Sequence, residues 1–291
     1  MDIDLDTTTA FMTAHARLLD RHRFARLRGD DGSRLLGAVE AYRNPDGGYG
    51  WGLEPDLRSV TSQPGAALHA LEAFADAGPA TTPRAAELCD WLDGASLPDG
   101  GLPFALPIPD PAACAPFWVS ADPGVSSLQI TTAVAGQAHR VAVHDPAVAA
   151  HPWLARATAY CLAAVDAIDG PPHALVLRFA FELLGAMGED AADRVARLGA
   201  HVPPDGVVHV EGGLEDEVMR PLDFAPLPAH PARALFADDV IDAELDRLAA
   251  GRRDDGGWTV DFDSHSPQAA LEWRGCATVR AVTILLAEGR A

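Results

Sequence analysis

The pattern of apolar positions predicts a chain built almost entirely from helices of two kinds. Segments such as 82–96 and 239–250 carry leucine or isoleucine along one face and acidic side chains elsewhere, which is typical of a helix with one solvated face. Segments such as 63–77 and 171–187 are apolar nearly all round, so we expect both of their sides to be buried. No alternating run is long enough to predict a sheet. We expect helices at 8–28, 31–43, 63–77, 82–96, 125–143, 147–166, 171–187, 189–200, 227–237, 239–250 and 267–289.

An Asp-Gly turn recurs between these segments. It reads Asp-Gly-Gly at 46–48, 99–101 and 255–257, and it is degenerate at 169–170 and 205–206. The mean spacing of about 52 residues is typical of an array of supersecondary units. Glycine accepts the positive φ of a helix C-terminal cap, and the aspartate can bind nearby backbone N–H groups. The chain is therefore expected to alternate an outer helix, a turn, a loop and an inner, buried helix.

This alternation predicts one all-α domain over residues 1–291. Six inner and five outer helices would form an (α/α)6-type toroid, with the inner ring inside the outer ring. The Pro-rich stretch 103–123 has no helical pattern, and we expect a long loop over one mouth of the toroid, since such loops are usually functional or mobile. Small residues on the inner helices, such as Ala66 and Ala133, are compatible with an open cavity and equally with close helix packing.

Composition narrows the functions that this chain can have. All 22 cationic side chains are arginines, and 42 acidic ones give a formal net charge of −20. The lack of lysine excludes Schiff-base chemistry and a Walker-type phosphate loop, and the negative charge argues against nucleic acid and anionic membranes as partners. The acidic start and the lack of a long apolar stretch predict neither a signal peptide nor an integral membrane segment, and hence a cytoplasmic protein. Four widely spaced cysteines favour reduced thiols without structural zinc.

The Asp-Gly-Gly turns at this spacing resemble the repeats of the squalene–hopene cyclase and protein prenyltransferase β-subunit superfamily. The run 44–58 is the most specific, and it is similar to bacterial proteins grouped under the prenyltransferase and squalene-oxidase repeat. The glutamine that usually precedes the repeat aromatic is mostly replaced here. The resemblance implies an α/α barrel, often with an apolar cavity for isoprenoid chains.

The resemblance also implies a candidate acid. Class II cyclases of this superfamily protonate an alkene with the middle aspartate of an Asp-x-Asp-Asp motif at the start of an inner helix. Segment 261–264 matches three of the four positions, and Asp263 would be the acid. The zinc ligands of the prenyltransferases have no counterpart here. We therefore expect no metal cofactor, except Mg²⁺ if the substrate is a diphosphate.

The loops that follow the turns should open at one end of the toroid and collect charge there. Our catalytic candidates are Asp263, Asp261, His265, Glu54 and Asp56, and our substrate-binding candidates are Arg58, Arg220, Trp273, Phe262, Trp118 and Phe224. A carboxyl group in this mouth could act as a general acid with a raised pKa, or several could hold magnesium for a diphosphate. Aromatic faces could stabilise a carbocation. Alternatively, the charged residues pair with one another and cap helices, and the aromatics anchor repeat turns.

Two further patterns have a structural explanation. Asp238, Asp239 and Asp242 match the magnesium motif of class I terpene synthases, but they begin an outer helix, where acidic residues favour the helix dipole. The histidines His15, His69, His139 and His173 fall within predicted helices. A lone histidine there is more often a satisfied side chain than a ligand.

Two functions remain open. The first is a terpenoid-cyclase-like enzyme, a lyase or isomerase that cyclises a hydrophobic isoprenoid substrate through an acid-initiated carbocation. The second is a non-catalytic α/α barrel that binds a lipid or peptide and receives a cationic group at its acidic mouth. The incomplete acid motif and the aromatic content of 7% favour the binder, while the charged mouth and the Pro-rich loop favour the enzyme. A single desolvated acid in an apolar cavity would distinguish the cyclase.

Overall fold

The computed structural model of the chain describes residues 4–290, which are predominantly helical, so the predicted all-α class is confirmed. The chain divides into two compact units. The middle unit is Arg28–Asp169, and the terminal unit joins Met1–Leu27 to Gly170–Ala291. No helix among the described residues is both long and apolar enough to span a membrane.

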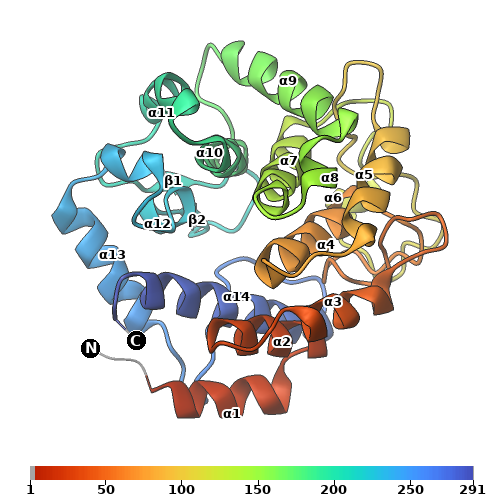
Figure 1. Cartoon of the computed structure of the whole chain (residues 1–291). Coiled ribbons are helices and arrows are strands. Elements are labelled where there is room, and N and C mark those ends of the chain that lie inside the picture. Colours follow the sequence, from red (N-terminus) through yellow and green to blue (C-terminus); the bar gives the residue numbers. More distant parts are fainter. Residues whose placement is uncertain (1–3, 291) are drawn as a thin grey trace. The chain divides into compact units, whose positions relative to one another are not determined.

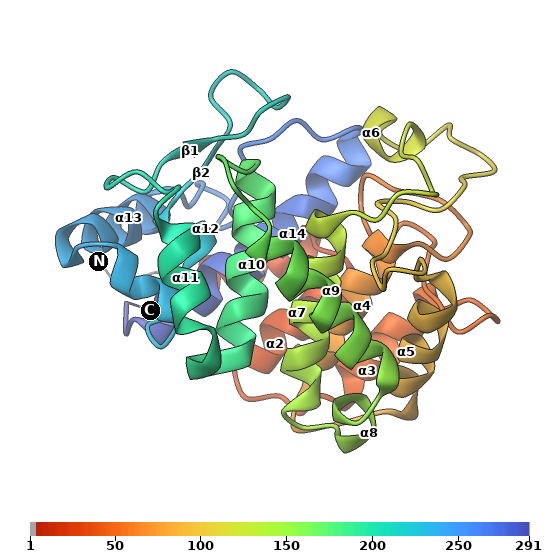
Figure 2. The same ribbon diagram turned by 90° about the horizontal axis from the view of Figure 1, so that it is seen from above.

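The middle unit is built from helices and the loops that connect them. Its elements are α3 (Ser33–Val39), η1 (Glu40–Tyr42), α4 (Pro64–Ala77), α5 (Pro83–Ala95), α6 (Pro116–Val119), α7 (Leu128–Ala142), α8 (Pro146–Ala149) and α9 (Pro152–Asp166). Helix α7 packs between α4 and α9, and α5 packs on α4 and α9 (Figure 1). Figure 2 shows α6 and its flanking loops at one end of these helices and α8 at the other. Proline in the first turn begins five of these helices, as its fixed φ favours.

Alanines line the contact between the two buried helices of the middle unit. Ala66, Ala70 and Ala73 on α4 and Ala133 and Ala138 on α7 are at most 1% exposed. Small side chains let the two helix backbones approach closely, and α4 and α7 pack against each other along this face. In this unit the alanines therefore reflect close helix packing.

The terminal unit brings together both ends of the chain. Its elements are α1 (Leu5–His15), α2 (Leu18–Leu27), α10 (Ala174–Met187), η2 (Gly188–Ala191), α11 (Ala192–Gly199), β1 (Val208–His209), β2 (Val218–Met219), α12 (Pro221–Phe224), η3 (Pro231–Leu235), α13 (Asp238–Ala250) and α14 (Pro267–Ala287). Helix α14 packs on α1, α2 and α13, and its core includes Phe11, Met12 and Trp258. The strands β1 and β2 form one short antiparallel hairpin.

Three of the expected helices are wrong in detail. The segment 8–28 is two helices, because the backbone is extended at Ala16, whose carbonyl accepts a hydrogen bond from the Arg21 side chain. The segment 147–166 divides into α8 and α9. The segment 227–237 forms only a 3₁₀ turn, Pro231–Leu235. The predicted loop 103–123 also contains the short helix α6.

The Asp-Gly-Gly turns at 46–48, 99–101 and 255–257 share one backbone geometry. Their first glycines, Gly47, Gly100 and Gly256, have φ values of 92°, 91° and 91°. In each turn the aspartate accepts a hydrogen bond from the N–H group of the second glycine, over 3.0, 3.1 and 3.1 Å respectively. A backbone hydrogen bond also closes each turn, from the residue two before the aspartate to the second glycine's carbonyl. The three segments are therefore copies of one local structure.

The degenerate turns keep only part of this geometry. Gly206 has a positive φ, and the side chain of Asp205 accepts a hydrogen bond from the Val207 N–H group. The residue at the closing position is Pro203, which has no N–H group to donate. Gly170 does not have a positive φ. The Asp169 segment is therefore not a copy of this turn.

A helix covers each of the three turns at corresponding positions. A Cβ atom on the first glycine would contact the backbone of Glu87, Arg156 or Thr7, and one on the second glycine would lie 2.6–2.7 Å from the ring of Trp91, Tyr160 or Phe11. These contacts recur four residues apart on α5, α9 and α1. Helix α1 therefore covers the last turn as α5 and α9 cover the first two.

Candidate functional site

The loop after the first turn directs a short acidic segment into the middle unit. Trp51 has a φ of 58°, and its side chain is exposed. Its backbone N–H group donates a hydrogen bond to the Ser59 carbonyl across the loop over 2.7 Å. The residues from Gly52 to Leu57, including Glu54 and Asp56, are buried. The loop is therefore closed on itself, with its carboxylates on the inside.

A second loop holds this segment in place. Leu57 forms a β-bridge with Cys114, and the Ala115 N–H group donates to the Asp56 carbonyl over 2.8 Å. The buried Gln63, just before α4, binds both backbone groups of Leu106 with its side-chain amide. The Pro-rich stretch is thus bonded both to the acidic segment and to the start of α4.

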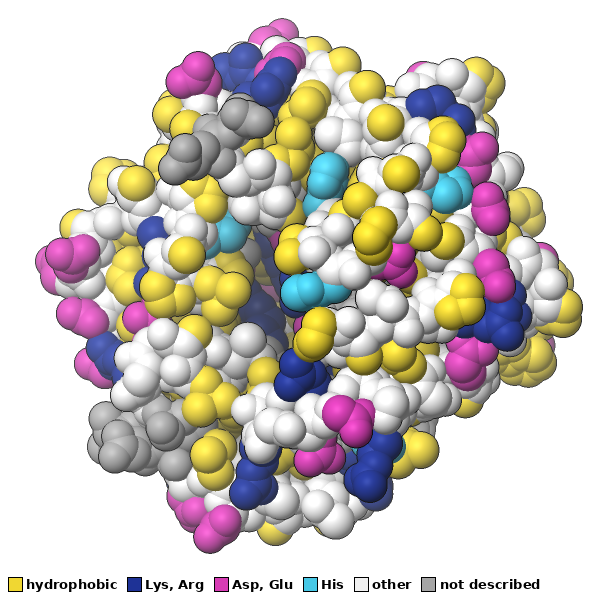
Figure 3. All heavy atoms as spheres, viewed as in Figure 1, with side chains coloured by type: hydrophobic (Ala, Val, Ile, Leu, Met, Phe, Trp, Pro, Cys, Tyr) yellow, Lys and Arg dark blue, Asp and Glu magenta, His cyan; other side chains and the backbone are white. Residues whose placement is uncertain are grey.

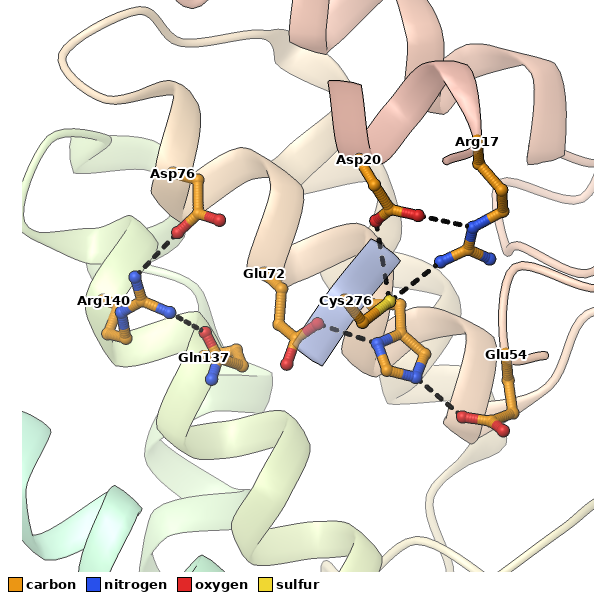
Figure 4. Close-up of polar contacts among 9 residues, drawn as sticks. Arg17, Asp20, Glu54, Glu72, Asp76, Gln137, Arg140 and Cys276 are labelled. Atoms are coloured by element: carbon orange, nitrogen blue, oxygen red, sulfur yellow. Dashed lines mark hydrogen bonds and ion pairs between the residues drawn. The ribbon is translucent and has the colours of Figure 1, made fainter. Parts of the chain in front are cut away.

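The imidazole of His69 lies between two carboxylates. Its Nε2 atom is 2.7 Å from Glu54 Oε2, and its Nδ1 atom is 2.7 Å from Glu72 Oε2 (Figure 4). Glu54 comes from the loop, whereas His69 and Glu72 lie one turn apart on α4. The second oxygen of Glu54 accepts the Asp56 N–H group over 3.1 Å. These three side chains, the Glu54–His69–Glu72 cluster, join the loop to the buried helix.

The cluster holds a proton on His69. Burial lowers the pKa of this imidazole, but the charge of Glu72 and the hydrogen bonds with both glutamates outweigh burial and raise the pKa to about 9. At neutral pH the imidazole is therefore a cation that donates from both nitrogens. With both carboxylates ionised, the cluster carries one net negative charge. The side chain of Glu72 is 23% exposed, so solvent reaches the cluster from that side.

The geometry of the cluster does not suit a metal ion. The two carboxylates contact opposite nitrogens of one ring, so the three groups do not converge on a common point. Within residues 4–290 no group of three histidine, cysteine, aspartate or glutamate side chains is arranged to hold a metal. What the arrangement can do is hold a proton and attract a second cation.

The other acidic candidates have different surroundings. Asp261, Asp263 and His265 are exposed residues of the segment before α14, in the terminal unit. Their exposure differs from the apolar, enclosed surroundings expected of an acid that protonates an alkene. Of the five catalytic candidates, the structure places Glu54 and Asp56 together in the buried segment of the middle unit.

The substrate-binding candidates of the terminal unit make structural contacts. The ring of Phe224 is buried against Phe181, with centroids 5.7 Å apart, and Arg220 lies 3.5 Å from Glu244. Phe262 and Trp273 meet edge to face at 5.2 Å. Asp223 lies close to Arg220 in the sequence. Burial alone would raise the pKa of the Asp223 carboxyl, but the charges of Arg280 and Arg178 outweigh burial and lower this pKa. The charges at the start of α12 therefore serve as ion pairs.

The remaining binding candidates, Arg58 and Trp118, lie in the middle unit beside the acidic segment. The guanidinium of Arg58 packs under Gly52, so that a Cβ atom there would lie 3.0 Å from it. Trp118 stacks on Phe104 with centroids 4.4 Å apart, and its ring covers Gly65 in the first turn of α4. The Nε1 atom of Trp118 is buried without a hydrogen-bond partner. Phe117 is exposed on the same short helix.

Sequence reasoning missed two members of the cluster. His69 was interpreted as a satisfied core or surface residue, and it contacts two carboxylates that this interpretation did not name. Glu72 was not considered. One feature of the sequence could have identified them. His69 and Glu72 are ionisable residues three positions apart on a helix that is otherwise apolar nearly all round, and side chains at this spacing can contact each other.

The acidic start of α13 has the expected structural role. Asp238 and Asp239 lie in its first turn, where negative charge favours the dipole, and Asp242 is paired with Arg290 at 2.7 Å. In the middle unit, a small cavity is lined in part by Phe74, Val141 and His144. Its volume is about 10 Å³, which is roughly the space of one water molecule. Neither feature is suited to an organic substrate.

The surface carries mixed charge in spite of the excess of acidic residues. On the face seen in Figure 3, arginine and acidic side chains alternate among apolar ones.

The chain matches no protein-family model and no curated protein sequence. A function therefore has to be inferred from the site itself.

Proposed function

We propose that this chain is a ligand-binding protein of the α/α-toroid type, and that the Glu54–His69–Glu72 cluster receives the cationic group of an amphiphilic ligand. The toroid arrangement rests on the alternation of helices and on the resemblance of the turns to terpenoid-cyclase repeats. The ligand class rests on one observation, which is that two carboxylates share a single imidazolium.

Charge balance supports a cationic ligand. An ammonium group beside Glu72 would neutralise the net negative charge, and it would also reduce the attraction that keeps the proton on His69. Binding of such a cation should therefore release a proton near pH 8, where His69 is charged in the free protein. A neutral or anionic head group gains neither effect.

The loops beside the cluster supply apolar surface for the rest of the ligand. Trp51 and Val60 are exposed on the loop before α4, and Phe117 and Val119 are exposed on α6, which follows a segment bonded to that loop. Exposed apolar side chains gathered on bonded segments are typical of binding surfaces. We propose that the alkyl or isoprenoid part of the ligand covers these residues.

Three probes with the same alkyl chain test the proposal. Dodecylamine, dodecanol and tridecanoate share a dodecyl chain and carry a cationic, a neutral and an anionic head group, and binding can be measured by calorimetry below the concentration at which each aggregates. We expect the amine to bind at least about tenfold more tightly than the alcohol, as expected for one charge-assisted contact. Glu54→Gln should abolish the preference, whereas Asp263→Asn, an exposed acid in the other unit, should keep it. Equal affinity for all three probes rules out the cationic ligand.

The second candidate is the terpenoid-cyclase-like enzyme. Its support is that ionised groups are buried on α4, where they cost stability that a purely structural helix would not give up. It ranks second because Asp263 is exposed and His69 holds its proton tightly. Incubation with farnesyl and geranylgeranyl diphosphates and with squalene, with and without Mg²⁺, followed by gas chromatography–mass spectrometry, tests it. A cyclic product lost in Asp263→Asn would establish that acid, and a product lost only in Glu54→Gln would assign the reaction to the cluster.

A further inference from the structure

The terminal unit contains a second cluster of reactive groups, made of Arg17 and Asp20 on α2 and Cys276 on α14. The Nη2 atom of Arg17 lies 3.2 Å from the Sγ atom of Cys276, which in turn lies 3.5 Å from Oδ1 of Asp20. Arg17 Nε also donates to Asp20 Oδ2 over 2.8 Å. Figure 4 shows the three side chains facing one another. The thiol is thus held between a guanidinium and a carboxylate.

The close approach of two helices builds this arrangement. Gly275 precedes Cys276, and a Cβ atom there would lie 3.0 Å from Asp20 Oδ2 and 3.3 Å from Ala16 Cβ. The side chains of Arg17 and Asp20 are only 8% and 0% exposed. An ion pair buried this deeply has a desolvation cost, and apolar side chains of the same size would pack there without it.

The other three cysteines have unreactive surroundings. Cys89, Cys114 and Cys161 are buried, and burial raises the pKa of all three thiols, to about 12 for Cys89 and Cys161. Cys276 is partly exposed. Because the thiolate is the nucleophile, a thiol needs both access and a nearby positive charge to react. Among the four cysteines, Cys276 combines the two.

We propose that Cys276 is the reactive thiol of this chain, a modification site for small electrophiles at which Arg17 stabilises the thiolate. In the reaction with iodoacetamide, the Sγ–carbon bond forms and the carbon–iodine bond breaks, and iodide leaves with the bonding electrons. The thiol proton passes to the Asp20 carboxylate and then to water. This site lies in the terminal unit, and it does not depend on the ligand proposed for the Glu54–His69–Glu72 cluster.

Labelling of the full chain tests the proposal. The protein is treated with iodoacetamide near neutral pH, and the modified fraction of each cysteine is followed by peptide mass spectrometry. The same reaction in guanidinium chloride gives the rate of each thiol in the unfolded chain. We expect the folded protein to label Cys276 at least about tenfold faster than the other three cysteines. Labelling of Cys276 no faster than that of Cys114 overturns the proposal.

Variants of the arginine test its role. Arg17→Gln should slow labelling of Cys276 by about three- to tenfold, and Arg17→Lys, which keeps the charge, should retain most of the rate. Arg290→Gln, which removes an arginine bonded elsewhere, should leave the rate unchanged. An unchanged rate in Arg17→Gln overturns the proposal, because exposure alone would then explain the labelling.

Loss of the arginine can unfold the unit, so a second variant keeps the test decisive. The double change Arg17→Met with Asp20→Leu replaces the buried ion pair by apolar side chains, which is often neutral for folding. Thermal unfolding verifies that this variant is folded. Its Cys276 should label about three- to tenfold more slowly than in the parent protein, and an equal rate contradicts the role of the ion pair.

Discussion

The Nε2 atom of His69 lies 2.7 Å from Oε2 of Glu54, and this contact ties an irregular loop to the most apolar part of the middle unit. Both side chains are buried, and Glu72 completes the pairing on the other ring nitrogen. Removal of one partner breaks charge-assisted contacts of the others, and these are costly to lose where the side chains are buried. The stability of the middle unit therefore depends on all three side chains together.

Substitution of the central histidine should destabilise the protein strongly. We expect His69→Gln to lower the free energy of unfolding by about 2–4 kcal/mol, because both carboxylates then lose the imidazolium that lies between them. Urea unfolding measures the change. Asp76→Asn provides the control, since Asp76 pairs with the exposed Arg140 at 2.9 Å and its loss should cost about 1 kcal/mol or less. Equal effects of the two changes would contradict the cluster's role.

The same histidine predicts a dependence of stability on pH. Its pKa is about 9 in the folded chain, against the ordinary histidine pKa of 6.5, so the folded state binds the proton more tightly. The resulting stabilisation is fully present below pH 6.5 and is lost as the pH rises through 9, for a total of roughly 2–4 kcal/mol. Urea unfolding at pH 6, 7.5 and 9 measures the decline. The difference from His69→Gln isolates this group, and parallel curves for the two proteins would refute the assignment.

The second glycine of a turn should be far less tolerant of substitution than an exposed glycine of the same unit that has free space around it. A Cβ atom on Gly101 would lie 2.6 Å from Ser126 Cβ and 2.7 Å from the ring of Tyr160, so Gly101→Ala should cost about 2–4 kcal/mol. Gly37 is the matched control, because it is an exposed helical glycine with free space around it. Gly37→Ala should stabilise the chain by about 0.5–1 kcal/mol. Similar losses in both variants would show that the turn packing is not restrictive.

Helices with a proline start and a clear apolar face were predictable from the sequence. The expected 63–77 and 82–96 became Pro64–Ala77 and Pro83–Ala95, because local signals set both ends. The break after α1 was not predictable, since no glycine or proline occurs at 16–17 and a hydrogen bond from Arg21 to Ala16 satisfies the free carbonyl. Tertiary contacts similarly support α6, where Trp118 packs over Gly65.

The candidate site was only half predictable for the same reason. Glu54 and Asp56 stand out in an unusual run of sequence, and they were identified. His69 and Glu72 are one turn apart on a helix. Their partner Glu54 lies 15 residues before His69, in an irregular loop. No helical or strand periodicity relates such positions, so only the folded chain shows that they meet.

Helix α1 should be essential for the turn at 255–257, because it covers that turn. Phe11 is 1% exposed, its ring lies where a Cβ on Gly257 would be 2.7 Å away, and Arg274 stacks over it at 4.5 Å. Phe11→Ala should therefore lower the free energy of unfolding by about 3–5 kcal/mol. Leu18→Ala, at a side chain that is 61% exposed on the neighbouring helix, should change it by less than about 0.5 kcal/mol. Hydrogen exchange locates the effect, with faster exchange expected in α14 and the turn while the helices of the middle unit keep their protection. Faster exchange confined to α1 would instead mean that the last turn holds its structure without the helix that covers it.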